Sequence, residues 1–213
     1  MADLFYSAGT RRMTSTALSL IEELDSTISN APVARQAKIL HSVADLFLDD
    51  SMTFSLEHVA LFDDVFRRLM EKADNATLVK LSGRLAPSGH SLASVFNTLA
   101  RHDDLAVAGP VLEFAPGLSE ELLSEIATAK GPKHLALISR RGAASETLTD
   151  ILIERGSPEI VLRLVTNTNA RLSEMAFVKL IKRAKTDRPL ANAIASRNDL
   201  PEELMPFLNL ALA

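Results

Sequence analysis

The segment AVAGPVLEFAPGLSEELL, residues 106–123, has three counterparts further along the chain. They are HLALISRRGAASETLTDIL at 134–152, IVLRLVTNTNARLSEMAFVKL at 160–180 and LANAIASRNDLPEELMPFL at 190–208. Each segment has a short apolar stretch, then a turn of polar or small residues, then a second stretch that opens on Ser or Pro followed by Glu. The pattern predicts four helical hairpins of one repeated kind.

The alignment of the four segments predicts which positions are equivalent. The first helix of each carries one equivalent apolar residue: Leu112, Ile138, Val165 and Ile194. Each second helix is expected to start at a capping residue: Ser119, Ser145, Ser173 and Pro201. The Glu that follows would meet the positive end of the helix dipole. Two short helices cannot bury their apolar faces alone, so we expect the hairpins to stack.

The composition agrees with a helical protein. The apolar residues are rich in Leu and Ala, with one Tyr and no Trp among 213 residues. Leu and Ala favour helices, whereas strands favour β-branched and aromatic residues. We predict an all-α chain: a right-handed, HEAT-like α-solenoid of about 12–13 helices. It forms one domain over residues 1–213, with a less regular region at 1–102 and the four hairpins at 103–213.

The first hundred residues show helical periodicity without a clear repeat. One apolar stripe runs from Leu18 to Ile28, and a second, after Pro32, holds Ile39, Leu40, Val43, Leu46 and Phe47. Ser55 is expected to cap the next helix without a full capping box, because the residue three places on is His58 and not an acid or amide. A separate N-terminal bundle and an atypical cap on the same stack are both open alternatives.

The last residues, 210–213, are Leu-Ala-Leu-Ala, whereas a terminal repeat should present a polar outer face. Two explanations are open. The chain is part of a longer protein, or its last helix packs on a partner or a second copy. A homodimer through this apolar C-terminus is therefore one expected partner.

Three segments carry a resemblance to a known family: DDLAVAGPVLEFAPGLSEELLSEI from Asp103, LALISRRGAASETLTDILIERG from Leu135 and ASRNDLPEELM from Ala195. They are similar to the bacterial domain-of-unknown-function 2336 family, from about Leu61 to the end. The single units also resemble HEAT-type and leucine-rich-variant repeats. The resemblance implies a helical solenoid of that general kind and implies no activity.

The sequence contains none of the usual signatures of catalysis. It has no Cys and no G-x-S-x-G, Walker or G-x-G-x-x-G motif, and no two of its five His are within ten residues of each other. The paired carboxylates fall mostly at predicted helix starts, where caps belong. We therefore expect a protein that is not an enzyme and has no cofactor and no metal site. Without Cys and with no long apolar run, it is expected in the cytoplasm.

The predicted turns after the first helices hold Arg and Asn at the repeat spacing. The candidate binding residues are Arg140, Arg141, Asn167, Asn169, Arg171, Arg197, Asn198, Arg101 and His102, and Arg84 occupies a comparable place. Arg can grip a carboxylate or a phosphate with two N–H groups. The same residues can also cap helix C-termini, so both interpretations stay open. We expect Arg140 and Arg197 to be the most informative positions.

The expected function is therefore that of a non-catalytic interaction or adaptor protein with a regulatory role. It would bind a protein or peptide on the concave face or the repeat turns of the solenoid. Binding of a nucleic acid or a nucleotide through the Arg and Asn residues is the alternative. The net charge of −4 makes nucleic acid the less expected partner.

Overall fold

The computed structural model describes residues 33–50 and 54–212 of the chain, and these residues are all-helical, as predicted. The twelve described α-helices are α2 (Val33–Asp50), α3 (Leu56–Met70), α4 (Asn75–Leu85), α5 (Ala93–Ala100), α6 (Leu105–Phe114), α7 (Glu120–Ala129), α8 (Pro132–Ile138), α9 (Glu146–Arg155), α10 (Pro158–Thr166), α11 (Glu174–Ala184), α12 (Arg188–Ala195) and α13 (Met205–Leu212). Two short 3₁₀ helices, η2 (Ala86–Ser88) and η3 (Glu202–Leu204), complete the described elements. No helix among them is both long and apolar enough to cross a membrane.

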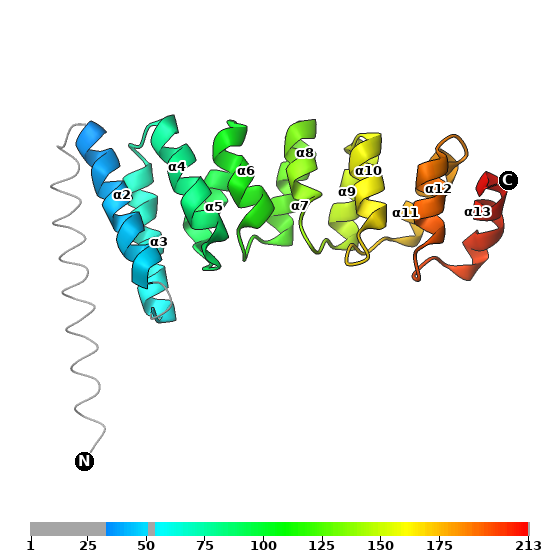
Figure 1. The fold of residues 1–213 in the computed structure, drawn as a ribbon, viewed down its shortest axis with the longest axis horizontal. Helices are drawn as coiled ribbons and strands as arrows, with labels where there is room; N and C mark the ends of the chain where they lie inside the picture. Colours follow the sequence, from blue (N-terminus) through cyan, green and yellow to red (C-terminus); the bar gives the residue numbers. More distant parts are fainter. Residues whose placement is uncertain (1–32, 51–53, 213) are drawn as a thin grey trace, which may run out of the picture.

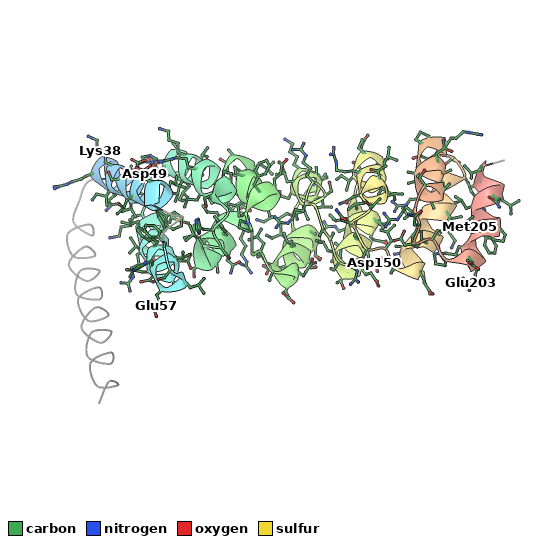
Figure 2. The ribbon with its side chains drawn as sticks, turned by 60° about the horizontal axis from the view of Figure 1, so that its bottom comes forward. Lys38, Asp49, Glu57, Asp150, Glu203 and Met205 are labelled. Atoms are coloured by element: carbon green, nitrogen blue, oxygen red, sulfur yellow. The ribbon has the colours of Figure 1, made fainter. Side chains whose placement is uncertain are left out.

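The helices form two rows that follow the order of the chain (Figure 1). Even-numbered helices lie in one row, where α2 packs on α4, α4 on α6, α6 on α8, and α10 on α12. Odd-numbered helices lie in the other, where α3 packs on α5, α7 on α9, α9 on α11, and α11 on α13. Figure 2 shows the two rows as separate layers. Helices α2–α5 continue the rows of the later helices and do not stand apart from them.

The core lies between the two rows. Each of the four repeated segments forms one helix of each row: α6 and α7, α8 and α9, α10 and α11, α12 and α13. The four residues predicted to be equivalent, Leu112, Ile138, Val165 and Ile194, are all buried. The predicted repeat therefore places the same apolar position in the core four times.

The starts of the second helices agree with the sequence. The hydroxyl oxygens of Ser119, Ser145 and Ser173 accept hydrogen bonds from the backbone N–H three residues on, at 3.2, 3.3 and 3.0 Å. Each cap satisfies a backbone donor that the helix itself cannot pair. The fourth start differs: after Pro201, which has no side-chain acceptor, the chain forms η3 before α13 begins.

Two expectations for the N-terminal region were wrong. Ser55 does form a full capping box, because the Nδ1 atom of His58 accepts the Ser55 backbone N–H at 3.3 Å in the place of an acid or amide. Leu46 is 54% exposed, because the buried face of α2 turns to Leu40, Ala44 and Phe47. The stripe from Leu18 to Ile28, Pro32 and Ala213 lie outside the described residues.

The alternation of rows gives the molecule two distinct edges. The turns inside the hairpins, such as α8–α9 and α10–α11, share one edge, at the bottom of Figure 1; we call it the turn edge. The connections between hairpins share the opposite edge. The turn edge is closely packed: Gly117 has φ +74°, and a Cβ on it would lie 2.2 Å from Oγ of Ser91 in the preceding turn. Only glycine fits there without strain.

Candidate functional site

The predicted Arg and Asn residues that follow even-numbered helices lie along the turn edge, and three of them bind the backbone of the preceding hairpin. Arg101 and His102 instead follow α5, in a connection between hairpins on the opposite edge, so the expectation that they share the place of the later Arg and Asn residues was wrong. The Arg141 guanidinium donates to the carbonyl oxygens of Leu112 and Ala115, both at 3.0 Å. The Asn167 amide donates to the carbonyl oxygens of Arg141 and Gly142, both at 3.2 Å. These side chains satisfy carbonyls that the end of a helix leaves unpaired.

Arg197 is the most fully bonded of the three. Its Nη atoms donate to the carbonyl oxygens of Val165, Asn167 and Ala170, at 2.8–3.0 Å. Its Nε and Nη2 atoms also donate to the carboxylate of Asp199, at 2.7 and 2.6 Å. The Arg197 side chain is only 3% exposed, and all five N–H groups of its guanidinium are thereby used. Arg197 has no donor left for a partner.

Four other residues that the sequence predicted, three Arg and one His, have polar partners near the surface. Arg101 binds Glu125 with two hydrogen bonds, at 3.1 and 2.7 Å. Arg84 binds Asp45 at 2.5 Å, and Arg140 binds Glu113 at 3.1 Å. The His102 ring accepts the backbone N–H of Asp104 at 3.0 Å. The three ion pairs join different helices, and the Arg84, Arg101 and Arg140 side chains remain 37–47% exposed.

The remaining predicted residues keep their side-chain donors available. Arg171, Asn169 and Asn198 are exposed, and their side chains form no hydrogen bond within the described residues. The backbone of Arg171 is fixed, because its N–H donates to the Ala144 carbonyl and its own carbonyl accepts the hydroxyl of buried Thr149. The turn edge thus presents these side chains on a rigid backbone.

A hollow of about 330 Å³ gathers several of these residues; we call it the α8–α10 hollow. It lies on the turn edge between the C-terminal ends of α8 and α10. Its lining is wholly polar or glycine: Ser139, Arg140, Arg141, Gly142, Arg163, Thr166, Asn167 and Asn169. Four of the nine predicted binding residues therefore meet in one place, and the others lie elsewhere along the stack.

The α8–α10 hollow is positively charged. Three Arg residues line it, and no Asp or Glu does. Arg141 bonds only to neutral carbonyls, and burial lowers the pKa of its guanidinium, opposed by the charge of Glu120. Burial without a bonded anion leaves a positive charge that a negatively charged group can stabilise.

Arg163 is the one charged lining residue that the sequence did not predict. It lies on the last turn of α10 and not in the turn that follows this helix, and its guanidinium forms no hydrogen bond within the described residues. A helical side chain four residues before Asn167 shares its face, and that spacing is the signal that was available. Arg155 was missed too, although its guanidinium donates to the Ala127 carbonyl at 2.7 Å in the manner of Arg141.

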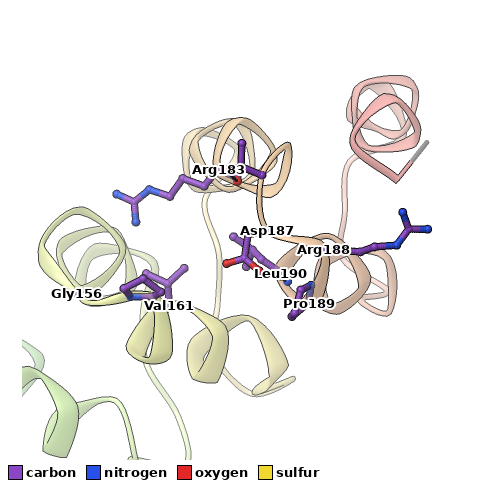
Figure 3. Close-up of a pocket in the computed structure, with 9 residues that line it drawn as sticks. Gly156, Val161, Arg183, Asp187, Arg188, Pro189 and Leu190 are labelled. Carbon is purple, nitrogen blue, oxygen red and sulfur yellow. Dashed lines mark hydrogen bonds between the residues drawn. The ribbon is translucent and has the colours of Figure 1, made fainter.

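A second hollow, of about 580 Å³, lies on the opposite edge between the N-terminal ends of α10 and α12. Figure 3 shows Arg183 and Asp187 on the side of this hollow, whereas Arg188 points away from it. The Asp187 carboxylate already accepts the Leu190 backbone N–H at 3.1 Å. The lining of this hollow therefore includes a carboxylate, in contrast to that of the α8–α10 hollow.

Two large apolar side chains accompany the polar ones on the turn edge. Phe114, at the end of α6, is 59% exposed, and Met175, at the start of α11, is 62% exposed. We call them the apolar pair. Large apolar side chains at the surface beside polar groups are typical of contact surfaces for proteins.

Within residues 33–50 and 54–212, no group of three or more His, Asp or Glu is arranged to hold a metal ion.

The fold and the hollow define a class: an all-helical protein built from repeated hairpins, with a basic depression on its turn edge. Residues 107–208, which span the four hairpins, match the model of a family described as an uncharacterised protein conserved in bacteria (DUF2336). The match confirms the resemblance predicted from the sequence, over a shorter range than expected. No curated protein and no solved structure matches the chain.

Proposed function

We propose that the protein is a non-catalytic, HEAT-like solenoid with a right-handed superhelix, which acts as an adaptor and binds a protein or peptide along the turn edge. Two rows of helices in chain order support the solenoid. In such folds each unit touches only its neighbours, and the long surfaces that result suit extended partners. Composition alone is the ground for placing it in the cytoplasm.

The observation that carries this proposal is the combination of residues on the turn edge. The apolar pair supplies side chains that a partner would bury, and the α8–α10 hollow supplies polar groups that would orient it. Binding sites commonly join an apolar contact with a few fixed polar groups. The turn edge unites both on a backbone held by hydrogen bonds between hairpins.

The test compares two serine variants in affinity purification with quantitative mass spectrometry. Phe114→Ser with Met175→Ser should lose partners that wild type retains, and each lost partner should bind purified wild type at least about tenfold more tightly than the variant. Leu46→Ser removes a similarly exposed side chain from α2 and should lose none. An identical set of partners for all three proteins contradicts the proposal.

A nucleic acid is the alternative partner, and the three guanidinium groups of the α8–α10 hollow are the observation that favours it. Binding to a nucleic acid backbone needs cations along a strand. On the turn edge, however, Glu120, Glu146 and Glu174 alternate with the Arg residues at the start of each second helix. These carboxylates would repel a chain of phosphates, so we favour a protein partner.

A homodimer through α13 is a further candidate. Phe207 and Leu210 of this helix are 57% and 75% exposed. Phe207→Ser with Leu210→Ser should shift a dimer to monomer in light scattering after size exclusion, with unchanged helicity. A monomeric wild type at millimolar concentration rules the dimer out.

A further inference from the structure

We propose that the α8–α10 hollow is a receptor for a phosphoryl group carried by a side chain of the partner protein. The inference rests on the proposed function, because it names the chemistry of one part of the binding surface. Its ligand is a phosphorylated peptide.

The free donors converge on the hollow from two helix ends. The guanidinium of Arg163, on α10, forms no hydrogen bond within the described residues, and the side-chain amide of Asn169 forms none either. Arg140, after α8, uses one Nη for Glu113 and remains 45% exposed. Each Arg has five N–H groups in a rigid plane, so most of this donor capacity is unused.

An anion at the C-terminal ends of two helices would normally meet unpaired carbonyl oxygens, which repel it. Here those carbonyls are occupied. On α8, the backbone N–H groups of residues 139–141 and the Ser139 hydroxyl donate to the carbonyls of residues 135–138. On α10, the carbonyls of residues 163–165 accept hydrogen bonds from Asn167, Thr166 and Arg197. The negative ends of both helices are therefore largely neutralised before a ligand arrives.

The local charges favour an anion. Arg140, Arg141 and Arg163 contribute three positive charges, and Glu113, bonded to Arg140, is the one carboxylate in direct contact with any of them within the described residues. The charge of Glu120 acts on Arg141 without a hydrogen bond. With both carboxylates counted, one positive charge remains in surplus, on a chain whose net charge is −4. A phosphoryl group carries a charge of about −1.5 to −2 at neutral pH.

The number of oxygens separates a phosphoryl group from a carboxylate. One guanidinium can saturate both oxygens of a carboxylate with two parallel hydrogen bonds. The hollow offers two accessible guanidinium groups, Arg140 and Arg163, and an amide at Asn169. Three terminal oxygens of a phosphoryl group can serve all of them at once, so the donor set matches this ligand better than an acidic side chain.

The experiment is a titration of ¹⁵N-labelled full-length protein with O-phosphoserine, followed by amide chemical shifts at constant ionic strength. Saturable shifts should appear at residues 139–142 and 163–169. Arg163→Ala should raise the dissociation constant at least tenfold, and Arg163→Lys should raise it less. Arg188→Ala removes an equal charge from the opposite edge, where Arg188 points away from its hollow, and should leave the binding unchanged. Shifts that do not saturate, or that Arg163→Ala leaves intact, overturn the proposal.

Further arms identify the source of the oxyanion. Acetate and serine should produce no saturable shift at the same residues, and a phosphoserine peptide should bind more tightly than a single-stranded oligonucleotide of equal charge. Tighter binding of the oligonucleotide, or equal binding of acetate, overturns the assignment to a phosphorylated peptide. The proposed function fails separately, in the comparison of the apolar pair with Leu46→Ser, which does not involve Arg163.

Discussion

The turn after α8 and the turn after α10 have the same place in the repeat and are closed in different ways. In the α10–α11 turn, Arg197 of the next hairpin reaches three carbonyl oxygens and is itself buried. In the α8–α9 turn, the shorter Asn167 reaches two carbonyl oxygens, and a hollow of about 330 Å³ lies beside it. The length of one side chain thus separates a closed structural turn from an open, basic one.

A substitution at Arg197 should have the largest effect on the difference between the two turns. Arg197→Ala removes five hydrogen bonds and leaves the carbonyls of the α10–α11 turn without their donor. We expect a loss of about 3 kcal/mol in the free energy of unfolding, since an unsatisfied buried polar group costs roughly 1–3 kcal/mol. Urea denaturation followed by circular dichroism measures it. Arg163→Ala, on the last turn of α10 beside the α8–α10 hollow, should stay within about 0.5 kcal/mol of wild type; equal losses would contradict the contrast.

Asn167→Arg tests the comparison from the other side, by giving the open turn the longer side chain. The new guanidinium should occupy the α8–α10 hollow and raise the dissociation constant for O-phosphoserine about tenfold or more. A tenfold change corresponds to roughly 1.4 kcal/mol of binding free energy. The measurement is the same amide titration. Asn198→Arg places an equal charge on the turn edge outside the hollow and serves as control. Stronger binding by Asn167→Arg would show that charge, and not space, limits the site.

The N-terminal caps of α9 and α11 should contribute equally to stability, although the two turns are closed in different ways. Ser145 and Ser173 form the same capping hydrogen bond in the two turns. Replacement of either Ser by Ala should lower the free energy of unfolding by about 1 kcal/mol in thermal or urea denaturation. Ser157→Ala, at a start where the side chain makes no capping hydrogen bond, should cost less. Unequal losses at Ser145 and Ser173 would extend the contrast between the turns to the second helices.

Asp199 gives the closed turn a dependence on pH. Its hydrogen bonds with Arg197 hold the pKa of this carboxyl below the ordinary value of 3.8, against a smaller effect of burial. A lowered folded-state pKa means that the stabilisation is complete above the unfolded value and is lost as pH falls through the folded value. Asp199→Asn should therefore flatten the loss of stability below pH 4, where wild type and variant curves converge.

At neutral pH the same variant should lose no more than about 1 kcal/mol, because solvent screens this half-exposed carboxylate. Melting temperatures measured from pH 2.5 to 7 provide both comparisons. Parallel curves for the two proteins would show that the Arg197–Asp199 pair has no part in acid unfolding.

The helical class and the capped starts were predictable because they depend on local rules. Ser119, Ser145 and Ser173 cap through atoms three residues away, and the equivalent core positions follow from helical periodicity. The capping box at Ser55 was missed because the rule used names acids and amides, whereas the accepting atom of His58 is an imidazole nitrogen. Leu46 was wrongly expected on the buried face of α2, because an apolar stripe indicates the orientation of a helix only to within about one residue.

The candidate site was half predictable. Arg140, Arg141, Asn167 and Asn169 follow from the repeat spacing, and the structure brings them together. The sequence could not separate Arg197, whose five donors are spent on a neighbouring hairpin, from Arg163, whose donors are free, because the difference arises from contacts across some 30 residues. Packing between repeats, and not the repeat itself, decides which Arg is available.

The side-chain hydrogen bonds by which Arg141, Asn167 and Arg197 close the hairpin turns run in one direction, from the later hairpin to the earlier one. Arg141 closes the α6–α7 turn, Asn167 the α8–α9 turn and Arg197 the α10–α11 turn. Each hairpin is therefore completed by a residue that leaves the ribosome after it. During synthesis, each of these three turns therefore stays open until the next hairpin has been made.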